Sequence, residues 1–167
     1  MEELINDIFY KEYKKYDQCV LDYGILKIDN YKGVESHKEA IKYYMDKNDY
    51  DIQIDKMECL SITSEELFKL PENREEERSR INIKDYHRPY WYLFLDPPYG
   101  TKYTIDDFIK INNLLFPNGK DNLEIYDWNV NWSNYFDDGL EWWGARCTSI
   151  YDKTMNRIVI ILASSTD

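Results

Sequence analysis

The C-terminal part of the chain contains the feature that most restricts the fold. Residues 145–151 alternate between apolar and polar side chains, and residues 157–163 are strongly apolar. The connection between them, residues 152–156, is mainly polar. Two such segments joined by a short connection predict a β-hairpin. The purely apolar run of residues 158–163 is far shorter than the ~20 residues that cross a bilayer. This hairpin is expected at the core of a sheet.

Further strands are predicted from β-branched, aromatic and alternating patterns. One covers residues 19–28, where Gly24 is expected to mark a bulge or bend. The segment PYWYLFL, residues 89–95, is apolar after its proline, which is typical of a central strand buried on both faces. The other predicted strands are residues 51–54, 56–62 and 123–128.

Apolar residues at spacings of three and four predict an amphipathic helix over residues 3–16. Three pairs of side chains have the spacing of a helix capping box, in which each side chain satisfies a free backbone amide. They predict a helix over residues 36–46, a short helix ending before Pro71, and a helix following residue 104; the pairs are Ser36 with Glu39, Thr63 with Glu66 and Thr104 with Asp107. His37 is expected on the solvent face of its helix, and His87 in a charged loop.

These elements predict an α+β fold, a single domain over residues 1–167 with an antiparallel or mixed β-sheet and helices packed mainly on one face. A chain of 167 residues is long enough to bury a large core. Residues 72–88 are highly charged, and residues 72–80 have no apolar side chain. We therefore expect a solvated charged segment there rather than a domain boundary.

Composition restricts the partners. The formal net charge is −11, which argues against nucleic acid or an anionic membrane and favours a basic protein as partner. The N-terminus carries charge from its second residue and has no apolar signal region, so a cytoplasmic location is predicted. Three cysteines without C-x-x-C spacing and only two histidines predict neither a metal site nor a cofactor. The oligomeric state stays open.

Residues 121–143, DNLEIYDWNVNWSNYFDDGLEWW, contain six carboxylates, seven aromatic side chains and no Lys or Arg. Trp and Tyr are common anchors of protein interfaces, and carboxylates around them can pair with a basic partner. The sequence therefore predicts a non-enzymatic protein-binding surface here, although the aromatic residues could instead cap the core. The predicted anchors are Trp128, Trp132 and Tyr135, and the predicted charge partners are Asp137, Asp138 and Glu141.

Two enzymatic alternatives stay open. The segment Asp96-Pro97-Pro98-Tyr99 resembles the D-P-P-Y motif of amino methyltransferases, which would give Asp96, Pro97 and Tyr99 the task of holding a flipped base. The chain lacks the glycine-rich turn with which that family binds S-adenosylmethionine. The second alternative is a carbohydrate-active or carbohydrate-binding site that combines the carboxylates near residue 137 with tryptophans stacking on a sugar ring.

The segments FLDPPYGTKYTIDDFIKINNLLFPNG and EWWGARCTSIYDKTMNRIVIILASSTD resemble a family of small uncharacterised bacterial proteins over residues 90–167. The resemblance implies a bacterial source and assigns no role to any residue. Small acidic proteins of this kind are similar, as a class, to immunity proteins that bind secreted basic toxins. An immunity or antitoxin-type role is therefore the expectation that this class analogy adds.

Overall fold

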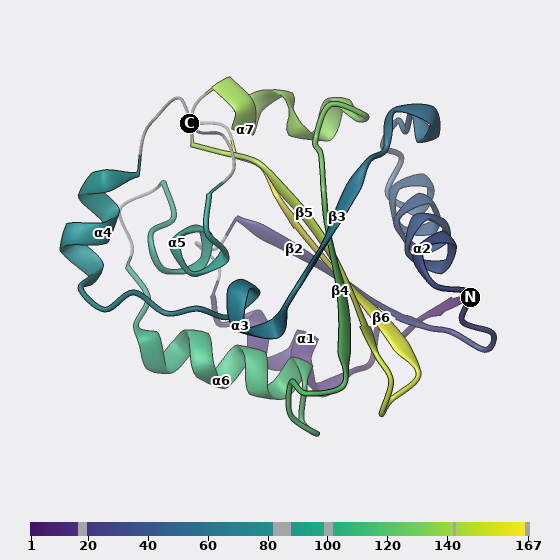
Figure 1. The fold of residues 1–167 in the computed structure, drawn as a ribbon, viewed down its shortest axis with the longest axis horizontal. Helices are drawn as coiled ribbons and strands as arrows, with labels where there is room; N and C mark the ends of the chain where they lie inside the picture. The colour runs from purple at the N-terminus through teal and green to yellow at the C-terminus, as the bar shows by residue number, and fades with distance from the viewer. Residues whose placement is uncertain (17–19, 82–87, 99–101, 142, 166–167) are drawn as a thin grey trace.

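The computed structural model describes residues 1–16, 20–81, 88–98, 102–141 and 143–165. In these ranges six strands form one antiparallel sheet in the order β1-β2-β6-β5-β4-β3 (Figure 1). The strands are β1 (Glu2–Glu3), β2 (Leu21–Lys27), β3 (Cys59–Ile62), β4 (Leu123–Trp128), β5 (Arg146–Asp152) and β6 (Arg157–Ala163). The expected α+β class with a single domain is confirmed.

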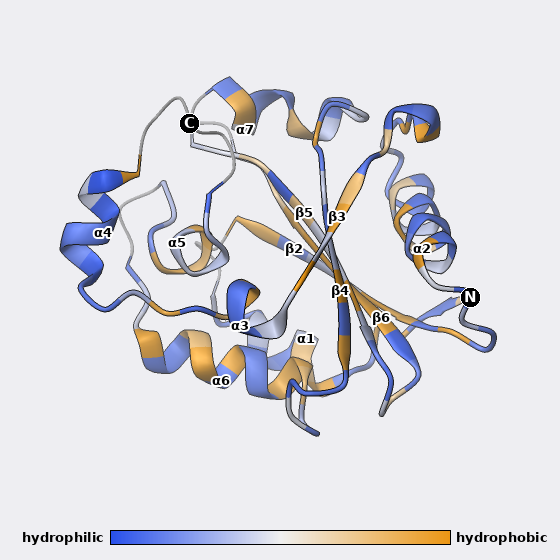
Figure 2. Cartoon of the chain, in the orientation of Figure 1, coloured by the Kyte–Doolittle hydropathy of each residue, from blue (hydrophilic) through white to orange (hydrophobic). Residues whose placement is uncertain are grey.

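The predicted C-terminal hairpin is present at the centre of the sheet. β5 and β6 pair from Arg146 with Ala163 to Asp152 with Arg157, and every residue of both strands is buried. The connection is therefore the four residues 153–156, one shorter than predicted, because Asp152 ends β5. Figure 2 shows the apolar residues of these strands running through the middle of the molecule.

Gly24 does not form the bulge that the sequence predicts. The pairing of β2 with β6 runs without interruption from Leu21 to Lys27. A Cβ at Gly24 would collide with the ring of Tyr44, which lies against the strand. The glycine is therefore required by the close approach of a helix to the sheet rather than by a bend in the strand.

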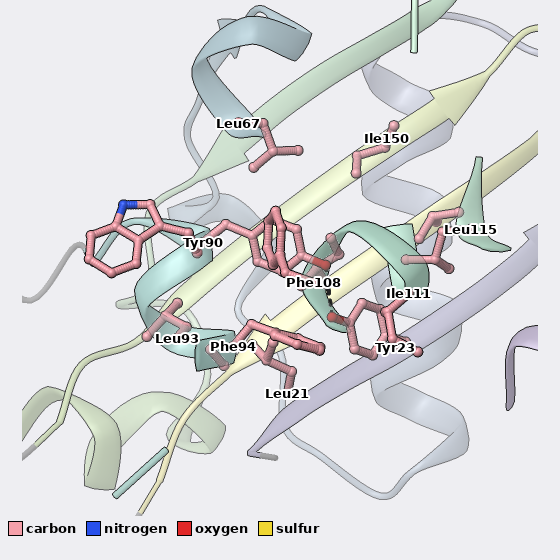
Figure 3. Packing of buried hydrophobic residues seen from close by; sticks show 14 of the residues in the cluster. Leu21, Tyr23, Leu67, Tyr90, Leu93, Phe94, Phe108, Ile111, Leu115 and Ile150 are labelled. Atoms are coloured by element: carbon pink, nitrogen blue, oxygen red, sulfur yellow. Dashed lines mark hydrogen bonds between the residues drawn. The ribbon is translucent and has the colours of Figure 1, made fainter. Parts of the chain in front are cut away.

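Four of the helices pack on one face of the sheet, as expected for helices mainly on one face. They are α1 (Ile8–Tyr13), α3 (Ser64–Leu67), α5 (Tyr90–Leu95) and α6 (Ile105–Leu115). Figure 3 shows side chains of α3, α5 and α6 meeting those of β2 and β5. The hydroxyl of Tyr23 in β2 lies 2.8 Å from that of Tyr90 in α5. Aromatic rings form much of this cluster.

The other face is covered by α2 (Val34–Lys47) and by side chains of residues 130–140. This second cluster includes Ile41 and Met45 from α2 against Leu26 and Ile160 from the strands. The remaining described helices are η1 (Ile54–Lys56), α4 (Arg74–Arg80), η2 (Asn134–Phe136) and α7 (Asp137–Glu141). None of the described helices is both long enough and apolar enough to cross a membrane.

The segment PYWYLFL is a helix, α5, and not the central strand that the sequence predicts. Five of its six helical residues are buried, because sheet, α6 and the N-terminal region surround it. A short continuous apolar run does not distinguish a buried strand from a buried helix. Two other expectations are also wrong: residues 51–54 form no strand, and the helix predicted over residues 3–16 is limited to α1, with β1 before it.

Two of the three predicted helix capping boxes are present. Thr63 and Thr104 each form the predicted capping box, with Glu66 and Asp107. The third pair does not cap a helix, because α2 begins at Val34 and its N-cap is Gly33. α4 has no buried residue, which fits the charged segment expected there, although Arg88 at the end of that segment is buried. Residues 82–87, and His87 with them, lie outside the described ranges.

Candidate functional site

The two predicted tryptophan anchors lie in the core rather than on the surface. Trp128 is 1% exposed and Trp132 is 0% exposed. Trp132 packs against Phe136 with ring centroids 5.0 Å apart, and its indole N–H donates to the carbonyl of Asn129. This position corrects the expectation that these indoles are displayed to a partner as anchors, because almost none of their surface is exposed. Instead, they pack residues 128–136 against the core.

Tyr135 is half-buried next to Phe136 and connects three segments that are far apart in sequence. Its hydroxyl donates to Asp22 Oδ2 at 2.6 Å, and its ring meets that of Tyr50 at 4.9 Å. Asp51 accepts the backbone N–H of Asn134 at 2.8 Å and so holds the start of η2. We call η2, α7 and the contacting side chains of Asp22, Tyr50 and Asp51 the acidic aromatic surface.

Burial raises the pKa of the Asp22 carboxyl, and the hydrogen bond from Tyr135 opposes part of that rise. The pKa of the Tyr135 hydroxyl is well above its ordinary value, first because of burial and then because of the neighbouring Asp22 charge. The tyrosine therefore stays protonated at neutral pH and keeps donating to the carboxylate. This bond holds η2 against β2.

The three predicted charge partners are displayed by α7. Asp137, Asp138 and Glu141 are all exposed, and none of them forms an ion pair with a described residue. All three side chains belong to one short helix that directly follows Phe136, which is 0% exposed. The helix therefore exposes negative charges that pair with no described cation, and it is attached to the core through Phe136.

Gly139 fixes α7 to the end of the sheet. Its N–H donates to Ser164 Oγ at 3.1 Å, and its carbonyl accepts the N–H of Gly144 at 2.7 Å. A Cβ at position 139 would collide with the Gly144 carbonyl oxygen and with Ser164. Only glycine fits this contact, so the carboxylates are displayed from a helix that is held on both sides.

A second polar cluster lies between α2 and the sheet and contains His37, which is 0% exposed and not on the solvent face where it was expected. Ser149 Oγ accepts the indole N–H of Trp128 at 2.8 Å and lies 2.7 Å from His37 Nδ1. On the other side of the ring, His37 Nε2 lies 2.9 Å from the Tyr31 hydroxyl, which donates to Glu124 Oε1 at 2.5 Å.

The donors in this cluster determine the tautomer of the ring. A tyrosine hydroxyl has one hydrogen, and that of Tyr31 is already donated to Glu124, so His37 Nε2 must carry the hydrogen of the ring. His37 Nδ1 then accepts from the Ser149 hydroxyl. Burial lowers the pKa of His37 to about 4, so the ring is neutral at pH 7. Ser149 is fully buried, and this cluster holds α2 on the sheet rather than exposing a nucleophile.

The D-P-P-Y segment begins at the end of α5 and not at the end of a strand. Asp96 and Pro97 are buried, and Tyr99 lies outside the described residues. The Asp96 carboxylate has the guanidinium groups of Arg74 and Arg78 at 3.5 and 3.6 Å, without a hydrogen bond. All described strand pairs are antiparallel, whereas a sheet that binds a nucleotide cofactor in the doubly wound manner is mostly parallel.

No group of three or more His, Cys, Asp and Glu side chains within the described ranges is arranged to hold a metal ion. The site residues that sequence reasoning missed are Asp22, Tyr50 and Asp51. They come from β2 and from the segment that follows α2, more than 80 residues before Tyr135 and Asn134. Only the pairing of distant segments brings them together, so no local pattern marked them.

Comparisons with protein-family models, with curated proteins and with solved structures found no match to this chain. Its function therefore has to be inferred from the side chains and surfaces described above.

Proposed function

We propose that this protein is a non-enzymatic binding module whose acidic aromatic surface binds a basic protein. The observation that carries the proposal is the display of Asp137, Asp138 and Glu141 without ion-pair partners among the described residues, on a helix held in place by Gly139. Charges that are not compensated within a protein are free to pair with a partner and to speed its association.

The rim of the surface supplies side chains suited to an interface. Tyr50 is 37% exposed and lies edge-to-face against Tyr135. Tyrosine is enriched in interfaces because it combines a large apolar ring with a polar end and has few rotatable bonds. The proposed anchors are therefore Tyr135 and Tyr50, which take over the role that the sequence assigned to the buried tryptophans.

The net charge of −11 supports a basic partner over nucleic acid, and the class analogy supports an immunity or antitoxin-type role in which binding blocks that partner. The two enzymatic alternatives receive less support. Trp128 and Trp132 are buried and cannot stack on a sugar, and the D-P-P-Y carboxylate faces two arginines. The carboxylates of α7 also come from one side only, whereas a glycosidase needs them on opposite sides of the bond.

The test is affinity capture from a lysate of the source organism with three forms of the protein. They are the parent, the variant Asp137→Asn/Asp138→Asn/Glu141→Gln, and a control with the same change of charge, Glu75→Gln/Glu76→Gln/Glu77→Gln in α4. We expect the parent and the control to retain one basic protein, which high salt releases, and the α7 variant to lose it. Equal retention by the α7 variant and the parent would contradict the proposal.

A further inference from the structure

Within the described ranges, strand β3 ends the sheet and has a free outer edge. Among the described strands it pairs only with β4, with Leu60 opposite Asp127. The carbonyl of Glu58, just before the strand, accepts the N–H of Asn129 at 3.0 Å, so Glu58 bonds toward β4. In an antiparallel ladder, successive residues of a strand direct their backbone N–H and C=O groups to opposite sides. Leu60, two residues after Glu58, therefore also bonds toward β4, while Cys59 and Ser61 direct their N–H and C=O groups outward. Outside that ladder, no described backbone group bonds to Cys59 or Ser61.

The free edge is apolar and unprotected. Leu60 is 75% exposed, the highest value among the large apolar side chains of the described residues. A groove of about 460 Å³ runs along the strand and is lined by Glu58, Cys59, Leu60, Ile62, Asp127, Trp128 and Asn129. Proteins usually cover, shorten or charge an edge strand, as this one does at its other edge, where β1 has two residues. An open edge with an apolar groove suits an added strand.

The charges beside β3 select the kind of strand. The groove lining contains two carboxylates, Glu58 and Asp127, and no Lys or Arg. Asp127 already pairs with Arg146 at 3.0 Å, which leaves Glu58 as the exposed charge of the groove lining. Lys38 and Glu35 of α2 also act on Cys59, and their opposite charges offset each other. A second copy of the chain would bring its own Glu58 to this edge and has the same overall net charge of −11, whereas a cationic segment would compensate Glu58.

We propose that β3 binds an extended, lysine- or arginine-bearing segment of the partner as an additional strand of the sheet. The segment bonds to the outward backbone groups of Cys59 and Ser61, places apolar side chains over Leu60 and a cation beside Glu58. The proposal rests on the proposed function in taking a basic partner, and it adds a second contact surface, separate from α7.

The probe is a nine-residue peptide with blocked ends that carries Val and Lys on one face, with Val opposite Leu60 and Lys opposite Glu58, and Thr at the positions between them. It is titrated into the labelled protein by NMR at low salt. Ser61→Pro removes one outward N–H while keeping the β3–β4 ladder, because proline is tolerated at the outer side of an edge strand. A thermal melt confirms that this variant is folded. The control probe is the same peptide with N-methyl groups on alternate residues, which blocks one hydrogen-bonding edge without changing its charge.

We expect the peptide to slow amide exchange at Cys59 and Ser61, and Ser61→Pro or N-methylation to weaken binding about tenfold or more, since each removes backbone hydrogen bonds. The α7 variant should bind the peptide within about threefold of the parent, because its changes lie outside the groove. Absence of binding, equal binding by Ser61→Pro, or a dimer in sedimentation that Ser61→Pro abolishes would each overturn the proposal. If only the α7 variant lost peptide binding, the peptide would bind at α7. The proposed function would then stand, and the β3 site would be rejected.

Discussion

Residues 121–143 contain two groups of side chains that differ in exposure. Trp128 and Trp132 form one group, and the carboxylates of α7 form the other. Both indoles are nearly or fully inaccessible, while Asp137, Asp138 and Glu141 are exposed. The difference teaches that the two residue types that mark this segment do different tasks. The aromatic residues stabilise the fold, and the carboxylates are available to a partner. Substitutions on the two sides should therefore affect different measurements.

The largest effect is expected on the buried side. Trp132→Ala removes a fully buried indole together with its contact to Phe136, and should lower the free energy of unfolding by about 3 to 5 kcal/mol. Urea denaturation followed by circular dichroism measures this change. Tyr50→Ala, at the exposed rim, is the matched control and should cost far less. Similar losses for the two variants would break the comparison.

The pH dependence tests the buried polar cluster beneath the same segment. The pKa of His37 is about 4 in the folded protein, below its ordinary value of 6.5, so the unfolded chain binds a proton that the folded chain does not. Its contribution is fully present above pH 6.5 and is lost as the pH falls toward 4, up to about 3 kcal/mol.

Urea denaturation of the parent and His37→Gln between pH 7 and pH 5 measures this contribution. The parent should lose stability more steeply than His37→Gln, because the variant has no titrating ring at this position. Parallel pH profiles would show that His37 is not the group responsible.

Gly139→Ala tests the connection between the two sides. The added methyl group meets the Gly144 carbonyl and Ser164, so α7 has to move, at a cost of about 1 to 3 kcal/mol. Both the melting temperature and partner capture should fall, because the carboxylates lose their position. Gly119→Ala, in a turn with open space around its Cβ position but a positive φ of 85°, provides a control for backbone strain alone. Unchanged capture by Gly139→Ala would show that the position of α7 is unimportant.

The smallest effect on stability is expected from the exposed side. The variant Asp137→Asn/Asp138→Asn/Glu141→Gln should unfold within about 0.5 kcal/mol of the parent, because surface changes without partners cost little. It should lose its partner all the same. Calorimetric melting measures the first property. A clear loss of stability would mean that the carboxylates support the fold, and the two tasks would no longer be separate.

The parts of the fold that local chemistry determines could be predicted from the sequence. The capping boxes at Thr63 and Thr104 depend on residues three positions apart, and the β5–β6 hairpin joins neighbouring segments. PYWYLFL could not be assigned correctly, because burial on all sides removes the periodicity that separates a helix from a strand. His37 was misplaced because its partner Ser149 lies 112 residues away.

The same distinction between local and distant interactions applies to the candidate site. The carboxylates of α7 are exposed, as a charged segment predicts, since burying an unpaired charge is costly. Aromatic residues carry no such signal, because Trp suits both a core and an interface. Tyr135 reaches the surface only because Asp22 and Tyr50 meet it there, and this depends on the order of the strands and on where α2 ends.

Carbodiimide cross-linking of the captured complex, followed by peptide mapping, tests the central claim most directly. The reagent joins carboxylates to lysines that are in direct contact, so it reports which acids of this protein meet the basic partner. We predict cross-links concentrated on Asp137, Asp138 and Glu141. Cross-links confined to other acids, such as those of α4, would contradict a binding role for the acidic aromatic surface.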